Sequence, residues 1–271
     1  MTELLTAAQM RAIEQAAIDS GEVTGLELME RAGRGVVEAI FEEWPELNHS
    51  EPWRELHEAD DQSSEDLSEQ EFPPAKRAVV LCGPGNNGGD GYVIARLLKE
   101  LDWDVDVYAY GDTKLLPSDA LVNHDRWKSI GVVNDIFQCA ETRLTEGHNK
   151  KTRTWSVPPL ETWDGRLLVD ALFGTGVDRP AKEDVREVVR QIELMSGSER
   201  RVAVDMPSWL HADTGVFVDF ASCELKKTWE AIQFVPIEAH LTVTFHRAKR
   251  GHKLREGLTA CGKVVVKDIG L

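Results

Sequence analysis

Hydrophobic positions in the first 45 residues recur with the period of an α-helix. Apolar residues repeat at helical spacing from Met10 to Ala17, and the Thr6–Gln9 segment before them resembles a capping box. Gly21 suits the end of this helix, because glycine adopts the left-handed conformation at little cost. A second apolar stripe runs from Leu28 to Phe41. We predict two helices here, with stripes that pack into a core; a dimer surface is the alternative.

Farther along the chain, apolar residues form short and nearly continuous runs separated by helical patterns. Strands of a parallel sheet give such runs, because both of their faces are buried. The predicted strands are 78–82, 105–110, 166–170, 201–205 and 240–245. The predicted helices between them are 92–101, 120–131 and 181–195, while residues 139–165 fit no regular pattern. This order predicts an α/β fold with a doubly wound, mostly parallel Rossmann-like sheet and helices on both faces.

Five glycines occupy the nine positions from Gly83 to Gly91, between the first predicted strand and the next helix. A strand, a glycine loop and a helix together bring backbone N–H groups close to a phosphate. Glycine spacing alone also fits a tight turn, but Asn86, Asn87 and Asp90 add polar side chains that a turn does not need. A carboxylate about 4 Å from a phosphate costs roughly 4 kcal/mol at an effective dielectric constant near 20. We therefore expect a positive charge beside Asp90, or a loop that is not purely a phosphate site.

Three aspartates, Asp90, Asp170 and Asp205, lie at or just past the carboxyl ends of predicted strands. If those strands are neighbours, the three carboxylates meet in the crevice where open parallel sheets bind ligands. They can share it with a phosphorylated ligand only when charge is compensated. A cation with oxygen ligands would compensate it, and Asn87, Asp170 and Ser208 offer oxygen donors without sulfur or imidazole. Capping of the following turns is the alternative role of Asp170 and Asp205.

Composition limits the classes of function. With 271 residues and 42% hydrophobic content, the chain can form one large domain with a substantial core. Its net charge of −16 disfavours a nucleic-acid or anionic-membrane partner. No stretch approaches the length of a transmembrane helix, and the N-terminus lacks a secretion signal. The four scattered cysteines, Cys82, Cys139, Cys223 and Cys261, indicate reduced thiols in a cytoplasm.

Charged residues gather in two segments. Residues 47–75 carry nine acidic residues against one arginine, which predicts a flexible or partly helical insertion outside the catalytic machinery. After the last predicted strand, His246, Arg247, Lys249 and Lys253 form a basic segment. This basic segment fits a contact to ligand phosphates or a solvated turn.

Several segments together resemble the NAD(P)H-hydrate epimerase family, whose shared unit is the YjeF N-terminal domain. Gly83–Gly91, followed by an apolar helix, looks like the signature of that family. The other matching segments follow in the right order and are 28–33, 169–176, 204–208, 242–245 and 262–270. The resemblance covers nearly the whole chain outside the acidic insertion and the residues around 139–165 and 220–238. It implies a single α/β domain over residues 1–271, with an insertion at 47–75.

The resemblance implies an enzyme of cofactor repair that interconverts the R and S epimers at C6 of hydrated NADH and NADPH. The positions that match the family's dinucleotide-binding residues are Asn86, Asn87, Gly88, Gly89, Asp90, Gly174, Thr175, Gly176, Val177, Asp178, Arg179, Pro180 and Asp205. The family holds a potassium ion at positions matching Asn87, Asp170 and Ser208, which agrees with the oxygen-only cation expected from charge. We also expect a homodimer in the cytoplasm.

The chemistry of the substrate indicates what the site must supply. C6 carries a hydroxyl and is bonded to ring nitrogen N1, whose lone pair can expel that hydroxyl. Water that returns to the other face yields the other epimer. One carboxyl group can protonate the leaving oxygen and accept a proton from the incoming water. We assign this role to Asp205, with Asp90 as the second candidate, and opening of the C6–N1 bond remains an alternative route.

One residue beside the predicted cation site departs from the family. Trp209 follows Ser208, at a position where the family usually has glycine. If the backbone needs a positive φ at this position, a bulky side chain there reshapes the loop or narrows the pocket.

Two other classes of function compete with this interpretation. A non-catalytic nucleotide-binding or interaction module of the same fold is one, although the three aspartates favour an active pocket. A conventional Rossmann oxidoreductase is the other and needs an acidic residue about 20 positions after the loop, near Asp106 and Asp112. Asp90 does not suit a pyrophosphate site. In many bacteria the domain is fused to a downstream dehydratase domain, which would begin about where this chain stops. The sequence holds no second, kinase-like glycine motif, so we expect no dehydration from this polypeptide alone.

Overall fold

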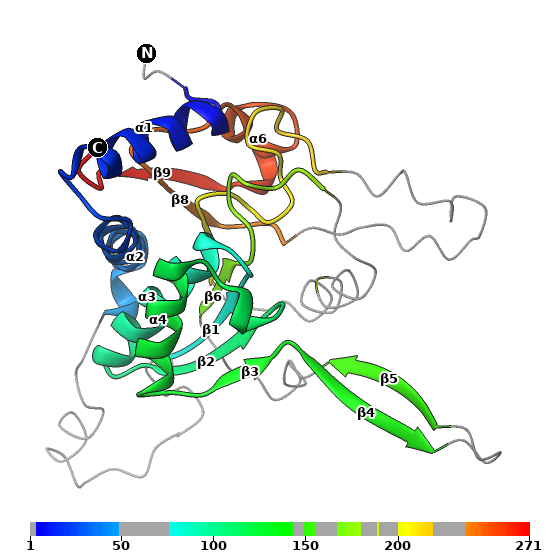
Figure 1. The fold of residues 1–271 in the computed structure, drawn as a ribbon. Helices are drawn as coiled ribbons and strands as arrows, with labels where there is room; N and C mark the ends of the chain where they lie inside the picture. The colour runs from blue at the N-terminus through cyan, green and yellow to red at the C-terminus, as the bar shows by residue number, and fades with distance from the viewer. Residues whose placement is uncertain are drawn as a thin grey trace, which may run out of the picture.

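A central sheet of seven parallel strands organises the protein (Figure 1). The computed structural model describes residues 4–48, 76–143, 149–155, 167–179, 189, 200–218 and 237–271. The strands of the sheet are β1 (Arg77–Cys82), β2 (Asp104–Ala109), β3 (Val133–Asp135), β6 (Leu167–Ala171), β7 (Arg200–Val204), β8 (Leu241–Phe245) and β9 (Lys263–Lys267). Their order is β3-β2-β1-β6-β7-β8-β9, so the chain runs from β1 to one edge and then returns to build the other half. This topology confirms the predicted doubly wound α/β fold.

The longer described helices cover one face of this sheet. α2 (Gly25–Glu43), α3 (Asn86–Glu100) and α4 (Ser118–Lys128) lie side by side (Figure 1). α1 (Ala7–Ser20) and the short α6 (Gly257–Ala260) lie near β8 and β9. Short 3-10 helices span Pro45–Leu47, Thr113–Leu115 and Arg250–Lys253. Among the described helices, none has the length and apolar character needed to cross a membrane.

Burial on both faces explains the continuous apolar run of β1. Ala78, Val80 and Cys82 belong to the core cluster that contains the inner faces of α2 and α3. Val79 and Leu81 point to the opposite face and join a second cluster. Because successive side chains of a strand face opposite sides, every position from Ala78 to Cys82 has to be apolar.

The start and end of α1 follow from local chemistry. Thr6 and Gln9 form the predicted capping box, in which the Thr6 hydroxyl accepts a hydrogen bond from the backbone N–H of Gln9 at 3.2 Å. Gly21 ends the helix with a φ of 77°, in the left-handed region that glycine adopts without strain. Both predictions are confirmed.

The helix predicted to begin at Tyr92 begins at Asn86 instead. The glycine-rich stretch is therefore a short loop followed by the first turns of α3. Gly88 lies so close to the carbonyl oxygen of Gly83 that no Cβ atom fits between them. Glycine at this position allows the helix to pack closely on the loop. In the sequence alone, a glycine with this role looks the same as a glycine in a turn.

Some strands escaped prediction, and some predictions lie outside the described residues. β3 has three residues, and β9 is an edge strand bounded by lysines, so neither gives a long apolar run. β4 (Phe137–Arg143) and β5 (Asn149–Trp155) form an antiparallel hairpin that projects from the sheet (Figure 1). The predicted helix 181–195, apart from Val189, and the insertion from residue 49 onward lie outside the described part of the chain.

Candidate active site

The predicted aspartates and Ser208 gather at the carboxyl edge of the sheet. β1, β6, β7 and β8 are parallel neighbours, as the sequence analysis required. Asp170 is the fourth residue of β6, Asp205 directly follows β7, and Ser208 lies in the turn after it. Asp90 lies in the second turn of α3, which leads away from the end of β1.

Asp170 and Ser208 form a buried pair that joins the ends of β6 and β7. The Ser208 hydroxyl donates to Oδ1 of Asp170 at 2.6 Å, and the Ser208 backbone N–H donates to Oδ2 at 3.0 Å. The N–H of Leu172 donates to Oδ1 at 3.2 Å, while the N–H of Phe173 donates to the Ser208 hydroxyl at 3.0 Å. Burial raises the pKa of Asp170 against the opposing effect of these hydrogen bonds. The pair fixes the loop that follows β6.

Asp205 is held from several directions. Its Oδ1 accepts hydrogen bonds from Nζ of Lys249 at 2.8 Å and from the Thr244 hydroxyl at 2.9 Å. Its Oδ2 accepts one from the backbone N–H of Thr175 at 3.1 Å, and Nε2 of His252 lies 2.8 Å from its carbonyl oxygen. Burial acts to raise the pKa of Asp205, but the Lys249 charge and the hydrogen bonds from Lys249 and Thr244 outweigh it and hold the pKa below its usual value.

Asp90 has a different environment from Asp205. Its side chain is half-buried, and no described residue donates a hydrogen bond to its carboxyl group. Burial raises its pKa well above the usual value, and the negative charges of Asp205 and Glu14 raise it further. Asp90 and Asp205 are therefore neighbouring carboxyl groups whose pKa values are shifted in opposite directions.

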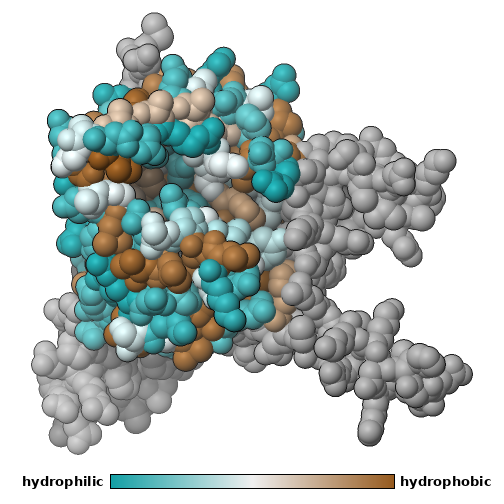
Figure 2. Space-filling view, in the orientation of Figure 1, coloured by the Kyte–Doolittle hydropathy of each residue, from teal (hydrophilic) through white to brown (hydrophobic). Residues whose placement is uncertain are grey.

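Glu14 of α1 faces the same site, although it was not among the predicted site residues. Burial and the charge of Asp205 raise the pKa of Glu14 against the opposing charges of Lys249 and Arg11. Figure 2 shows a hollow in this face of the molecule below α1. The sequence contained one signal for this role. Glu14 directly follows Ile13 and places an acidic side chain beside the apolar stripe of the predicted helix.

Gly174 allows the loop after β6 to pass close to two of the predicted residues. A Cβ atom at Gly174 would lie 3.0 Å from both Oδ1 of Asn87 and Oδ2 of Asp205. Nδ2 of Asn87 is buried and has no hydrogen-bond partner among the described residues. Because buried polar groups almost always have partners, this amide is a candidate contact for a ligand.

The predicted cation ligands suit a hard ion by their chemistry. Asp170 and Ser208 are in direct contact. Asn87 lies beside Gly174, and the preceding residue, Phe173, donates its N–H to the Ser208 hydroxyl. All three side chains offer oxygen, the donor that alkali and alkaline-earth ions prefer. Within the described residues, no group of three or more His, Cys, Asp or Glu side chains could hold a metal ion.

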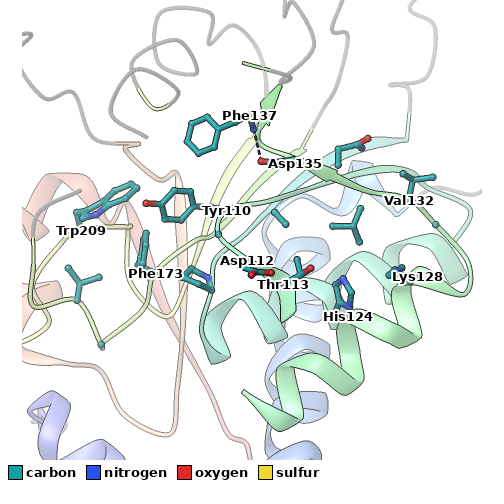
Figure 3. A pocket seen from close by; sticks show the side chains of 18 of the residues that line it. Tyr110, Asp112, Thr113, His124, Lys128, Val132, Asp135, Phe137, Phe173 and Trp209 are labelled. Atoms are coloured by element: carbon teal, nitrogen blue, oxygen red, sulfur yellow. Dashed lines mark hydrogen bonds between the residues drawn. The ribbon is translucent and has the colours of Figure 1, made fainter. Parts of the chain in front are cut away.

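A cavity of about 1150 Å³ borders the loops that follow β1, β2, β3 and β6. One side is aromatic: Phe173 packs against Tyr110 at 5.9 Å and against Trp209 at 4.9 Å between ring centroids. His124 and Lys128 of α4 lie on the other side (Figure 3). Four of the predicted binding residues, Gly176, Val177, Asp178 and Arg179, also line this cavity. The Gly174–Arg179 loop therefore connects the aspartate cluster to the cavity, while Pro180 lies outside the described residues.

Trp209 has a positive φ, as considered for this position because the family usually has glycine there. Its φ is 67°, in the left-handed region that favours glycine, and its side chain is only 2% exposed. The indole fills space beside Phe173 instead of pointing into solvent. In the basic segment after β8, the side chain of Lys249 is buried. It therefore does not belong to a solvated turn, which was one of the two expectations for this segment.

Comparisons with known proteins identify the family. A profile of the family described as "YjeF-related protein N-terminus" matches residues 25–251. Two curated proteins named NAD(P)H-hydrate epimerase, from Roseobacter litoralis and Rhodobacter capsulatus, are each 38% identical to this chain over 100% of both chains. A protein from Methanothermobacter thermautotrophicus, named bifunctional NAD(P)H-hydrate repair enzyme, is 32% identical over 97% of this chain and 40% of its own length. The crystal structure of yeast ynu0 shares the fold, with a TM-score of 0.63 and 20% identity over 98% of this chain and 88% of its own.

Proposed function

The chain belongs to the family of YjeF-related N-terminal domains, and we propose that it is an NAD(P)H-hydrate epimerase, an isomerase of cofactor repair. The observation that carries this proposal is the placement of Asp205 at the carboxyl edge of the sheet, beside the loop of Gly174 and Thr175 that Asn87 also approaches. The charge of Asp205 contributes to the raised pKa of Asp90. Similarity over the full length of two proteins of that name supports it.

The site offers the chemistry that epimerisation at C6 requires. A carboxyl group protonates the C6 hydroxyl, and the N1 lone pair forms the N1=C6 bond as water leaves. Water then adds to the other face of C6, the N1=C6 electron pair returns to N1, and the carboxylate recovers its proton directly or through a second water. Positioned acid–base catalysis contributes about 10² to 10⁴ to the rate. Asp90 and Asp205 are the two candidates for this group.

The dinucleotide has a binding surface on both sides of the aspartates. The first N–H groups of α3, at Asn86 to Gly88, have no partners within the helix and attract a phosphate. Asn87 adds its unpartnered buried amide. From there the Gly174–Arg179 loop leads to the cavity walled by Tyr110 and Phe173, whose size and aromatic side suit the remainder of a dinucleotide.

Potassium is the cation that we propose for this site. Asn87, Asp170 and Ser208 would hold it through oxygen atoms. When bound, it would offset the combined negative charge of the aspartates and the ligand's phosphates. The free buried thiols of Cys82 and Cys261 support a reducing compartment, which we propose to be the cytoplasm.

A purified epimer provides the test of this function. The protein is mixed with one C6 epimer of NADH hydrate, and the ratio of the two epimers is followed by chromatography. We expect the second epimer to form faster than the spontaneous background, and to form more slowly with Asp90→Asn or Asp205→Asn. Asp102→Asn is the matched control, because Asp102 is exposed, precedes β2 at the opposite edge of the sheet and has a φ of 62° that asparagine tolerates. Conversion no faster than background in the unaltered protein would overturn the proposal.

A further inference from the structure

Lys249 is a buried cation that contacts Asp205 directly and through Thr244. Its side chain is 1% exposed, and its Nζ donates to Oδ1 of Asp205 at 2.8 Å, to the Thr244 hydroxyl at 2.7 Å and to the Phe245 carbonyl at 3.2 Å. These three acceptors match the three N–H bonds of an ammonium group. A buried charge without such partners is strongly destabilising, so Lys249 and Asp205 depend on each other.

The segment that carries Lys249 also holds the backbone of Asp205. The N–H of Lys249 donates to Nδ1 of His252 at 3.0 Å, which requires Nδ1 to be unprotonated. Nε2 of His252 therefore carries the ring proton and donates it to the carbonyl oxygen of Asp205 at 2.8 Å. This contact supports the left-handed backbone of Asp205, whose φ is 66°. Burial lowers the pKa of His252, in agreement with the neutral ring.

Asp205 is consequently a poor group for moving protons. Its two carboxylate oxygens accept three hydrogen bonds, from Lys249, Thr244 and the N–H of Thr175. Protonation would place an O–H where a donor already points, and would leave the Lys249 charge without its counter-ion. Asp90 faces this cluster from α3 and Glu14 faces it from α1, and no donor among the described residues occupies the carboxyl group of Asp90.

We propose that Lys249 is a positioning residue that keeps Asp205 a fixed, ionised acceptor and thereby leaves Asp90 as the carboxyl group that exchanges a proton with the C6 oxygen. This inference rests on the proposed epimerase activity. The ionised Asp205 stabilises the positive ring that forms when the hydroxyl leaves, because a preorganised charge opposite a developing charge lowers the barrier. In its protonated form Asp90 gives its proton to the leaving hydroxyl, and the resulting carboxylate recovers one from the incoming water. This assignment reverses the order of the two aspartates that the sequence analysis favoured.

The pH profile of kcat separates the two roles. In the unaltered protein we expect kcat to fall as the pH rises through the raised pKa of Asp90, because the acid then loses its proton; this is the alkaline fall. Asp90→Asn is expected to lower kcat about 10² to 10⁴-fold and to remove this alkaline fall. Asp205→Asn is expected to lower kcat but to keep the alkaline fall. If Asp205→Asn removes the fall while Asp90→Asn retains it, the inference is wrong although the epimerase function stands. If the unaltered protein does not epimerise, the proposed function itself fails.

Variants of Lys249 test the positioning role directly. Lys249→Met removes the counter-ion of Asp205 and raises its pKa, so activity is expected to begin to fall with decreasing pH at a higher pH than in the unaltered protein. Lys249→Arg is expected to restore part of the original profile. Thr244→Val removes a weaker donor from Asp205 and tests the same direction if Lys249→Met does not fold. Lys263→Met removes a lysine from an exposed ion pair with Glu43 and is the matched control. The role of Lys249 would be overturned if activity in folded Lys249→Met fell at the same acidic pH as in the unaltered protein. If Lys249→Met does not fold, the same result in Thr244→Val would overturn it.

Discussion

Three aspartates of similar sequence context have different chemical states because different neighbours surround them. Asp170 accepts two hydrogen bonds from Ser208 and joins the loops that follow β6 and β7. Asp205 is paired with Lys249, and its pKa is lowered. Asp90 is without a donor among the described residues, and its pKa is raised. Carboxyl groups whose pKa values are pushed apart in this way are a common arrangement in acid–base catalysis.

Trp209 sets the loop beside Ser208 through two opposed effects. A left-handed backbone at a bulky residue costs about 1–2 kcal/mol, while truncation of a buried tryptophan costs about 3–5 kcal/mol. We therefore expect Trp209→Gly to lower the free energy of unfolding by roughly 1–4 kcal/mol in spite of the relieved strain. Urea unfolding measures this change, with Trp209→Phe as the control that keeps the strain and most of the packing. A glycine variant as stable as the unaltered protein would contradict this account.

At the same scale, the sequence predicted which residue types meet but not their division of roles. Asp90, Asp170, Asp205 and Ser208 lie at or beyond the carboxyl ends of strands, and the edge of a parallel sheet brings such positions together. The partner of Asp205 could not be identified, because Lys249 is one of several basic residues after β8 and only the fold shows which of them is buried.

At the scale of elements, predictions succeeded where one physical requirement dominates. Burial on both faces made β1, β6 and β8 readable as short continuous runs, whereas β2 and β7 are buried on both faces only over their last three residues. The start of α3 was placed six residues late, because glycines that allow close packing look the same in sequence as glycines of a loop. The role of α1 was underestimated, since its stripe indicated packing alone although one turn of the helix also brings Glu14 to the aspartates.

The contribution of α1 to catalysis can be measured through Glu14. Its negative charge raises the pKa of Asp90, so Glu14→Gln lowers that pKa, and Asp90 loses its proton at a lower pH. The alkaline fall of kcat should then begin at a lower pH. The loss at a fixed alkaline pH should be about two- to fivefold, as expected when a partly exposed charge interaction of about 0.5–1 kcal/mol is removed. Glu22→Gln, an exposed acid just beyond the end of α1, should leave the profile unchanged. A shift toward higher pH in Glu14→Gln would contradict the proposed electrostatics.

At the scale of the whole molecule, the charge of the protein opposes the ligand that we propose. The chain carries a net charge of −16, and a hydrated dinucleotide is itself an anion. The α3 N-terminus offers only about half a positive elementary charge to offset this repulsion. Lys249, the buried cation of the site, is already neutralised by Asp205. The cation that we propose at Asn87, Asp170 and Ser208 would supply a further positive charge at the carboxyl edge of the sheet, in addition to Lys128 and Arg179, which line the cavity.

We therefore expect the choice of monovalent cation to control ligand affinity. Replacing potassium chloride by tetramethylammonium chloride at equal ionic strength keeps charge screening constant but supplies an ion too bulky for the Asn87, Asp170 and Ser208 oxygens. We expect the Kd for NADH hydrate to rise at least tenfold, because about 1.4 kcal/mol of compensating interaction corresponds to that factor. Calorimetric titration measures the Kd without reliance on turnover. Ser208→Ala removes one of the proposed oxygen ligands and should abolish most of the difference between the two salts, whereas Ser129→Ala, on the exposed end of α4, should preserve it. Equal affinity of the unaltered protein in both salts would show that the aspartate edge binds its ligand without an alkali cation.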